Sequence, residues 1–123
     1  MLSLPPSVRI FLCLAPTDMR RSFDGLAALV PAALSQDPLS GHLFVFRNRR
    51  GDRVKVLWWD RDGYALWYKR LEAGVFRFPQ ANDSGAVEVS SSDLTLVLEG
   101  IDVRGVRRQK RYRRGVASCN EVA

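Results

Sequence analysis

Three β-rich runs of the chain, at residues 42–47, 53–59 and 64–70, are separated by very short polar connections. Residues 48–52 read NRRGD and residues 61–63 read RDG, and both contain residue types that favour tight turns. Connections of this length can join only antiparallel neighbours, because a parallel crossover needs about a dozen residues or more. The middle of the chain therefore predicts an antiparallel meander.

The segments before this meander predict one more strand and a helix. Residues 8–14 are apolar and lie between proline-containing stretches, which is typical of a short central strand. Apolar side chains recur at helical spacing over residues 22–35, which predicts an amphipathic helix with Ser22 as a candidate N-cap. Pro31 lies inside this pattern and should kink or shorten the helix.

The segments after the meander complete an α+β prediction. Residues 76–79 are typical of a last edge strand, and residues 90–93 can cap a second helix that ends before Gly100. The fold class is therefore α+β: an antiparallel meander of about four to five strands with two helices. We expect a single domain over residues 1–103, followed by a basic, flexible tail over residues 104–123.

The charge of the chain indicates a polyanionic partner. The protein has 123 residues, a formal net charge of +6 and a pI near 10.0. Residues 101–123 hold seven Lys or Arg against two carboxylates, whereas residues 1–100 hold twelve against eleven. The excess positive charge therefore lies in the tail, where it favours nucleic acid or an acidic surface.

Other residue types argue against a disulfide framework, a metal site or an export signal. Cys13 and Cys119 are far apart, no CxxC pair is present, and His42 is the one histidine. The N-terminal residues have no positive leader, and Arg9 interrupts their apolar run. We expect a cytoplasmic protein with no cofactor and no bound metal.

The candidate catalytic residues have simpler structural roles. Asp60 and Asp62 could together bind a metal ion for phosphoryl transfer, but an Asp-Gly pair between two β-rich runs is a hairpin signal. His42 has no evident nucleophile beside it, and Ser90 belongs to a serine run that caps a helix. The sequence therefore predicts that the protein is not an enzyme.

A three-residue turn at residues 61–63 would pair Val56 with Tyr68 and group the side chains of the hairpin by face. One face would be apolar and the other would mix cations with indoles, a combination that holds phosphates and stacks on bases. Alternatively, a helix covers the indoles, and a two-residue turn would shift the pairing and weaken the grouping. The mixed face would consist of Arg53, Lys55, Leu57, Trp59, Trp67 and Lys69.

The tail is the more direct indication of phosphate binding. Residues 104–114 contain seven cations and almost no apolar side chain that could join a core. The arginines around residues 48–53 could make a second phosphate contact. The equal alternative is that they are simply the exposed residues of a turn. The predicted nucleic-acid-binding residues are Arg104, Arg107, Arg108, Lys110, Arg111, Tyr112, Arg113, Arg114, Arg49, Arg50, Arg53, Lys55 and Lys69.

Several ordered motifs also resemble a known family. Residues 17–26 read TDMRRSFDGL and resemble the family segment TDMRKGFDGL, although the basic-glycine pair of that segment is Arg21-Ser22 here. The chain is similar, over roughly residues 5–104, to the small TnpB accessory protein of insertion-sequence family sixty-six, an Orf-two-like transposase protein. The further matching segments are residues 41–50, 55–59, 62–63, 68–76 and 98–102.

The resemblance implies a bacterial mobile-element protein that supports transposition, while a separate transposase of the same element carries the catalytic acids. The leading hypothesis is a non-catalytic accessory protein that binds DNA through basic residues and assists that transposase. Alternatively, the protein is an adaptor that docks on the transposase through Leu57, Trp59 and Trp67, as aromatic anchors do at interfaces. A metal-dependent nuclease using Asp60 and Asp62 is a minor alternative.

Overall fold

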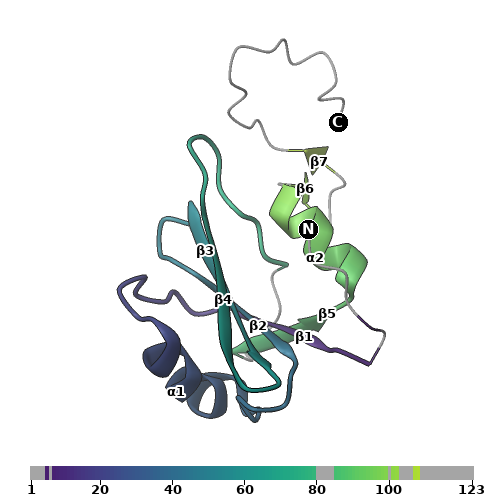
Figure 1. Ribbon diagram of the computed structural model, residues 1–123. Helices are drawn as coiled ribbons and strands as arrows, with labels where there is room; N and C mark the ends of the chain where they lie inside the picture. The colour runs from purple at the N-terminus through teal and green to yellow at the C-terminus, as the bar shows by residue number, and fades with distance from the viewer. Residues whose placement is uncertain (1–4, 6, 80–84, 100, 103–106, 109–123) are drawn as a thin grey trace.

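The computed structural model describes residues 5, 7–79, 85–99, 101–102 and 107–108 (Figure 1). A five-stranded sheet in the order β4-β3-β2-β1-β5 has one helix on each face, and a two-stranded sheet, β6-β7, follows the second helix. The elements are β1 Ile10–Cys13, α1 Phe23–Leu34, β2 Leu43–Arg47, β3 Arg53–Asp60, β4 Gly63–Arg70, β5 Ala86–Val89, α2 Ser91–Glu99, β6 Ile101–Asp102 and β7 Arg107–Arg108.

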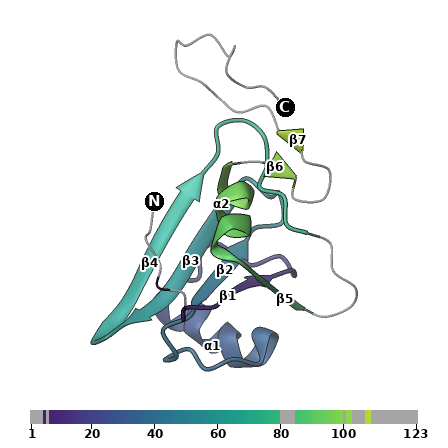
Figure 2. The same cartoon turned by 90° about the vertical axis from the view of Figure 1, so that its right-hand side faces the viewer.

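The predicted α+β class and the meander β2-β3-β4 are confirmed. The sheet is mixed, because β1 pairs in parallel with β2 and antiparallel with β5. The chain connects the parallel pair through α1, which crosses one face of the sheet, while α2 lies against the other face (Figure 2). β4 forms one edge of the sheet and β5 the other.

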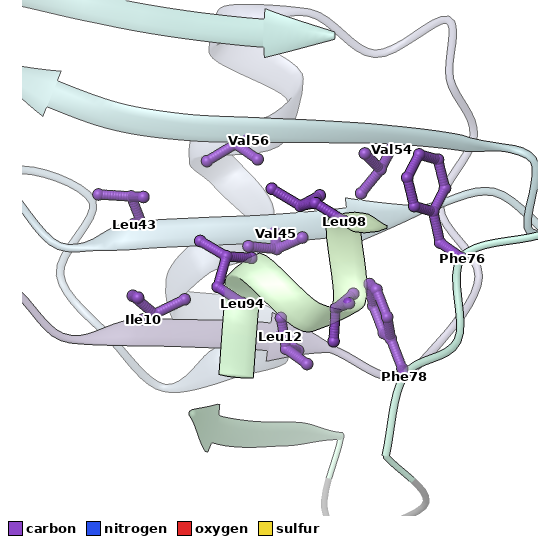
Figure 3. Close-up of a cluster of buried hydrophobic side chains, with 11 residues drawn as sticks. Ile10, Leu12, Leu43, Val45, Val54, Val56, Phe76, Phe78, Leu94 and Leu98 are labelled. Carbon is purple, nitrogen blue, oxygen red and sulfur yellow. The ribbon is translucent and has the colours of Figure 1, made fainter. Parts of the chain in front are cut away.

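Alternating residues of the strands build a separate core on each face. The larger core lies under α2, whose Leu94, Val97 and Leu98 pack on the sheet (Figure 3). The core under α1 contains the helix residues Leu26, Val30 and Leu34. The sheet contributes Ile10, Leu12, Leu43, Val45, Val54 and Val56 to the first core and Phe11, Cys13, Phe44, Phe46 and Leu57 to the second.

The predicted edge strand at residues 76–79 is wrong. Phe76 and Phe78 alternate as strand residues do, but both rings are buried in the α2-side core, and the segment joins no sheet. The Arg47 guanidinium lies 4.2 Å from the Phe78 ring centroid and donates to the Phe76 carbonyl at 3.0 Å. The edge position is instead occupied by β5, a segment for which the sequence predicted no element.

The predicted register of the β3-β4 hairpin is also wrong. Asp60 pairs with Gly63 and Val56 pairs with Trp67, so the loop has two residues and β4 is shifted by one position. A shift of one residue moves every β4 side chain to the other face. The expected mixed face of cations and indoles is therefore divided between the two sides of the sheet.

The helix boundaries agree closely with the sequence, with one difference in capping. The Asp93 N–H donates to the Ser90 hydroxyl at 3.1 Å, so the predicted cap of α2 is confirmed. Ser22 occupies the N-cap position of α1, but its side chain makes no capping hydrogen bond. Pro31 lies inside α1, and the helix continues beyond it to Leu34.

Candidate nucleic-acid interface

The loop between β2 and β3 presents two arginines at its tip. The Gly51 N–H donates to the Asn48 carbonyl at 3.1 Å, which closes a turn around Arg49 and Arg50. Gly51 is buried with a positive φ of 79°, and a Cβ added there would lie 3.3 Å from the Val75 Cβ. This position therefore requires glycine for both its backbone conformation and its close packing.

Further hydrogen bonds hold this loop in one shape. The Asn48 side chain accepts from the Arg53 N–H at 3.0 Å and donates to an Asp52 carboxylate oxygen at 2.7 Å. The segment after β4 supports the loop from outside: the Leu71 N–H donates to the Asp52 carbonyl at 2.8 Å, and the Phe76 N–H donates to the Gly51 carbonyl at 2.7 Å. The arginines thus extend from a fixed backbone.

A surface pocket of about 370 Å³ lies where this loop meets the chain between β1 and α1. The Thr17 N–H donates to the Arg47 carbonyl at 2.9 Å, which brings the two segments together. Thr17 itself is buried at this junction. The pocket is lined by Thr17, Asp18 and Met19 from one segment and by Asn48, Arg49, Arg50, Asp52 and Arg53 from the other.

Lys55 fastens the turn that forms one wall of this pocket. Its ammonium donates to the carbonyls of Met19 at 2.8 Å and of Arg21 at 2.7 Å, and it lies 4.7 Å from the Tyr68 ring centroid. The Lys55 residue is 6% exposed. We therefore leave Lys55 out of the candidate surface, because its charge already binds main-chain oxygens beneath it.

The two carboxylates that line the pocket are both engaged by neighbours. Arg20 donates to both Asp18 oxygens: its Nε lies 3.1 Å from Oδ1 and 3.0 Å from Oδ2, and its Nη2 lies 2.7 Å from Oδ2. This hydrogen bonding lowers the pKa of Asp18 to about 2. The side-chain hydrogen bond from Asn48 lowers the pKa of Asp52. Within the described part of the chain, the exposed Arg49 side chain has no ion pair, so its positive charge faces solvent.

Arg53 extends the cationic surface from the pocket toward the edge of the sheet. Its Nη1 donates to the Tyr68 hydroxyl at 2.9 Å, and in the hairpin register it stands opposite Arg70. Like charges directly opposite each other on one face of a sheet are unfavourable. Glu72 offsets part of this repulsion, because its carboxylate accepts from Arg70 Nε at 3.0 Å.

The structure thus brings together three of the predicted phosphate-binding residues and separates others. Arg49, Arg50 and Arg53 line one pocket. Lys69 pairs with Val54 and so lies on the α2 side of the sheet, away from Arg53. In the tail, Arg107 and Arg108 form β7, of which the structure describes the backbone, and Arg104, Lys110, Arg111, Tyr112, Arg113 and Arg114 lie outside the described residues.

The predicted partner-binding triad does not form one surface. Leu57 is buried in the core under α1. Trp59 is half-buried on that same side, with its ring centroid 5.1 Å from that of Tyr64, whereas the half-buried Trp67 packs against the core under α2. The one-residue register shift explains this separation.

The remaining catalytic candidates stand apart from the pocket. Asp60 and Asp62 are exposed at the β3-β4 turn, where the Asp62 N–H donates to the Asp60 carbonyl. His42 Nδ1 accepts from the Arg9 N–H at 3.0 Å. No group of three potential metal ligands gathers among the described residues, and none of the helices described there has the length and apolarity to cross a membrane.

The sequence interpretation missed two parts of this site: the wall formed by residues 17–19, and Tyr68 beside Arg53. The wall had a signal, since these residues begin the first motif of the family resemblance. Nothing in the linear sequence joins that motif to the arginine loop, because the contacts that do so are between distant residues. Thr17 bonds to Arg47, and Lys55 bonds to Met19 and Arg21 across 34 to 36 residues.

Comparison with known proteins assigns this α+β chain to a family. The chain belongs to the family described as IS66 Orf2 like protein, whose model matches residues 8–108. It is therefore an insertion-sequence protein, and its family suggests an accessory role in transposition.

Two similar proteins come from Sinorhizobium fredii (strain NBRC 101917 / NGR234). The uncharacterized protein y4jC is 42% identical over 102 residues, which cover 83% of this chain and 86% of the relative. The uncharacterized protein y4hO is 43% identical over 104 residues, which cover 85% of this chain and 90% of the relative. No solved structure matches the chain.

Proposed function

We propose that this protein is a non-catalytic accessory factor of transposition that binds DNA phosphates through Arg49, Arg50 and Arg53. The observation that carries the proposal is the pocket between the arginine loop and residues 17–19. Asp18 is paired with Arg20, whereas Asp52 keeps its negative charge while it accepts from Asn48. Among the described residues, three guanidinium groups therefore face one unpaired carboxylate, and the lining of the pocket is positive on balance. An anion there would also relieve the repulsion between the facing arginines.

The rigid loop supports the same proposal on energetic grounds. Binding is weakened when a partner must order flexible side chains and loops, and a loop already fixed by hydrogen bonds avoids part of this cost. Arginines on such a loop can hold a phosphate in one geometry, as bidentate guanidinium contacts require. Contacts of this type position a protein on DNA without reading its sequence.

The proposal is tested by charge reversal at the loop tip. We expect Arg49→Glu/Arg50→Glu to weaken DNA binding by about tenfold or more at low salt, and to lower the slope of log affinity against log salt by about two. Fluorescence anisotropy of a labelled oligonucleotide measures both quantities. The control is Arg49→Lys/Arg50→Lys, which keeps the charge; unchanged affinity in the Glu variant would refute the role of the loop.

The basic tail is proposed as a second phosphate contact. Its many cations would add sequence-independent affinity by counterion release. Replacing Arg111, Arg113 and Arg114 by Gln in the full chain tests this independently of the loop. We expect a further fall in affinity and in salt slope, and equal binding by the two chains would remove the tail from the proposal.

The absence of catalysis is part of the proposal and has its own test. Asp60 and Asp62 are exposed at a two-residue turn, at the opposite end of β3 from the arginine loop, which supports a structural role for both. We expect no cleavage of single- or double-stranded DNA in magnesium or manganese. Cleavage that is lost in Asp62→Asn would instead identify a nuclease.

A second candidate function is an adaptor that docks on the transposase of the same element. It is favoured by β4, an eight-residue edge strand that pairs with β3 and has no second strand beside it in the described part of the sheet. Edge strands offer unpaired backbone groups to another chain. Co-purification of the transposase with Trp67→Ala and with the unmodified chain tests this; equal capture would count against Trp67 as an anchor.

A further inference from the structure

We propose that the pocket and Tyr68 together form a site for single-stranded DNA, in which a phosphate lies in the pocket and an unpaired base stacks on the Tyr68 ring. This inference rests on the proposed function and names the form of DNA that the site takes. Arg53 joins the two parts, since it lines the pocket and its Nη1 donates to the Tyr68 hydroxyl at 2.9 Å.

The Tyr68 ring is held as a fixed platform rather than as a mobile surface side chain. The Lys55 ammonium lies 4.7 Å from the ring centroid, and its own position is fixed by two main-chain carbonyls. The hydroxyl is fixed by Arg53. These contacts fix both the ring and its hydroxyl before any ligand arrives, which reduces the entropy lost on binding.

Tyr68 also presents a free surface for stacking. Lys55, which approaches the ring, is 6% exposed and so lies on its inner side, whereas Tyr68 is 46% exposed. Among the large hydrophobic residues that the structure describes, exposure of this extent is shared with Phe23 and Leu39. Phe23 begins α1 two residues after Arg21, whose carbonyl also binds Lys55.

A platform of this kind favours a single strand. In a duplex, the faces of the bases are stacked on one another and are closed to a protein side chain unless the helix is opened. Single-strand-binding surfaces combine a positive groove with aromatic rings on which successive bases stack. Phosphate binding by Arg49 and Arg50 would serve either form of DNA, so selectivity for a single strand must come from Tyr68.

The inference is tested with the full chain, a labelled oligodeoxythymidylate and a labelled duplex of the same length. Removing the ring in Tyr68→Leu should weaken binding of the single strand by about tenfold, because stacking on one aromatic ring contributes on this scale. Binding of the duplex should stay within about twofold. Equal weakening of both ligands, or no weakening of either, would overturn the inference.

Two matched variants separate stacking from folding. Tyr68→Phe keeps the ring and removes the hydrogen bond to Arg53, so it should retain most of the affinity for the single strand. Tyr64→Leu removes an aromatic ring from the same strand and face, where it packs on Trp59, and should change single-strand binding little. A loss in Tyr64→Leu as large as that in Tyr68→Leu would contradict a specific stacking role.

A measurement on the unmodified chain keeps the inference testable if Tyr68→Leu does not fold. An oligonucleotide containing 5-iododeoxyuridine should crosslink on irradiation to Tyr68, and peptide mass spectrometry would locate the adduct. A crosslink confined to other aromatic residues would overturn the inference. If Arg49→Glu/Arg50→Glu weakens binding but Tyr68 is not involved, the proposed function stands and the single-strand inference alone fails.

Discussion

The β2-β3 loop and the β3-β4 turn connect strands of one meander, yet they are built in different ways. The first is closed by Asn48, requires a glycine at residue 51 and is supported by the segment after β4. The second consists of Arg61 and Asp62, both exposed, and a Cβ added at Gly63 would meet nothing within 4 Å. The loop that presents arginines is fixed, while the turn only reverses the chain.

The two connections differ in the support that the rest of the fold gives them. A turn that only reverses the chain needs few contacts, whereas a loop that must hold charged side chains in one geometry needs support from elsewhere in the fold. Substitutions at the two connections should therefore change the stability of the fold to different extents.

The largest effect should come from the residue beneath the supported connection. Lys55→Met removes the buried donor of two partly buried hydrogen bonds, to the main-chain carbonyls of Met19 and Arg21, and should lower the free energy of unfolding by about 2–3 kcal/mol. Urea unfolding followed by tryptophan fluorescence measures the change. The control Lys69→Met, at an exposed position of β4, should cost less than about 0.5 kcal/mol; similar costs would refute the anchoring role of Lys55.

A pair of glycine substitutions compares the two connections directly. Gly51→Ala places a Cβ where φ is 79° and Val75 is close, so we expect a loss of about 1–2 kcal/mol in unfolding free energy. Gly63→Ala adds a Cβ in open space without a positive φ and should change stability by less than about 0.5 kcal/mol. Thermal unfolding of the two variants checks this, and equal losses would abolish the contrast.

The simple turn should tolerate, and even gain from, a change at Arg61. This residue has a φ of 57°, a conformation that costs about 1 kcal/mol for residues with a Cβ. Arg61→Gly should therefore raise the free energy of unfolding by about 0.5 kcal/mol, after allowance for the greater freedom of glycine in the unfolded chain. Arg61→Ala keeps the Cβ and should show no gain, so a matching rise there would point to charge instead.

The smallest effect should appear as a dependence on pH at the motif turn. Because the folded pKa of Asp18, about 2, is below its ordinary value of 3.8, the Arg20 contact stabilises the fold above pH 3.8 and is lost as the pH falls through 2. The difference in melting temperature between the unmodified chain and Asp18→Asn should shrink over that interval. Arg20→Gln should narrow the interval without removing it, because the main-chain N–H of residue 20 still donates to Asp18 at 2.9 Å. An unchanged difference in either comparison would contradict the pairing.

Local patterns in the sequence were sufficient for much of the fold but not for its pairing. The Ser90 cap, the strands of the meander and the helix around Leu26 each follow from residues close together in the chain. The Asp-Gly pair predicted a turn correctly, but Arg61 rather than Gly63 takes the left-handed conformation. That single difference moved Trp67 to the opposite face of the sheet.

The candidate site was less predictable because it depends on contacts between distant segments. Arg49, Arg50 and Arg53 could be identified by charge and position, and the pocket confirms that they lie together. The burial of Lys55 could not be predicted in this way, because a lysine in an alternating strand is expected on the exposed side. The three-residue turn paired Tyr68 with Val56 on the apolar face, whereas in the structure Tyr68 pairs with Lys55 on the other face.

β1 lies inside the sheet, between β2 and β5, and this placement affects how the chain reaches its folded state. β1 precedes the other described strands in the chain, yet its antiparallel neighbour β5 follows after more than seventy residues, and α2, which covers one side of it, comes later still. Contacts this distant in sequence slow folding. Until residues 85–99 arrive, one edge of β1 and the apolar surface later covered by α2 remain open, so nascent chains of this protein depend on a late event to avoid association.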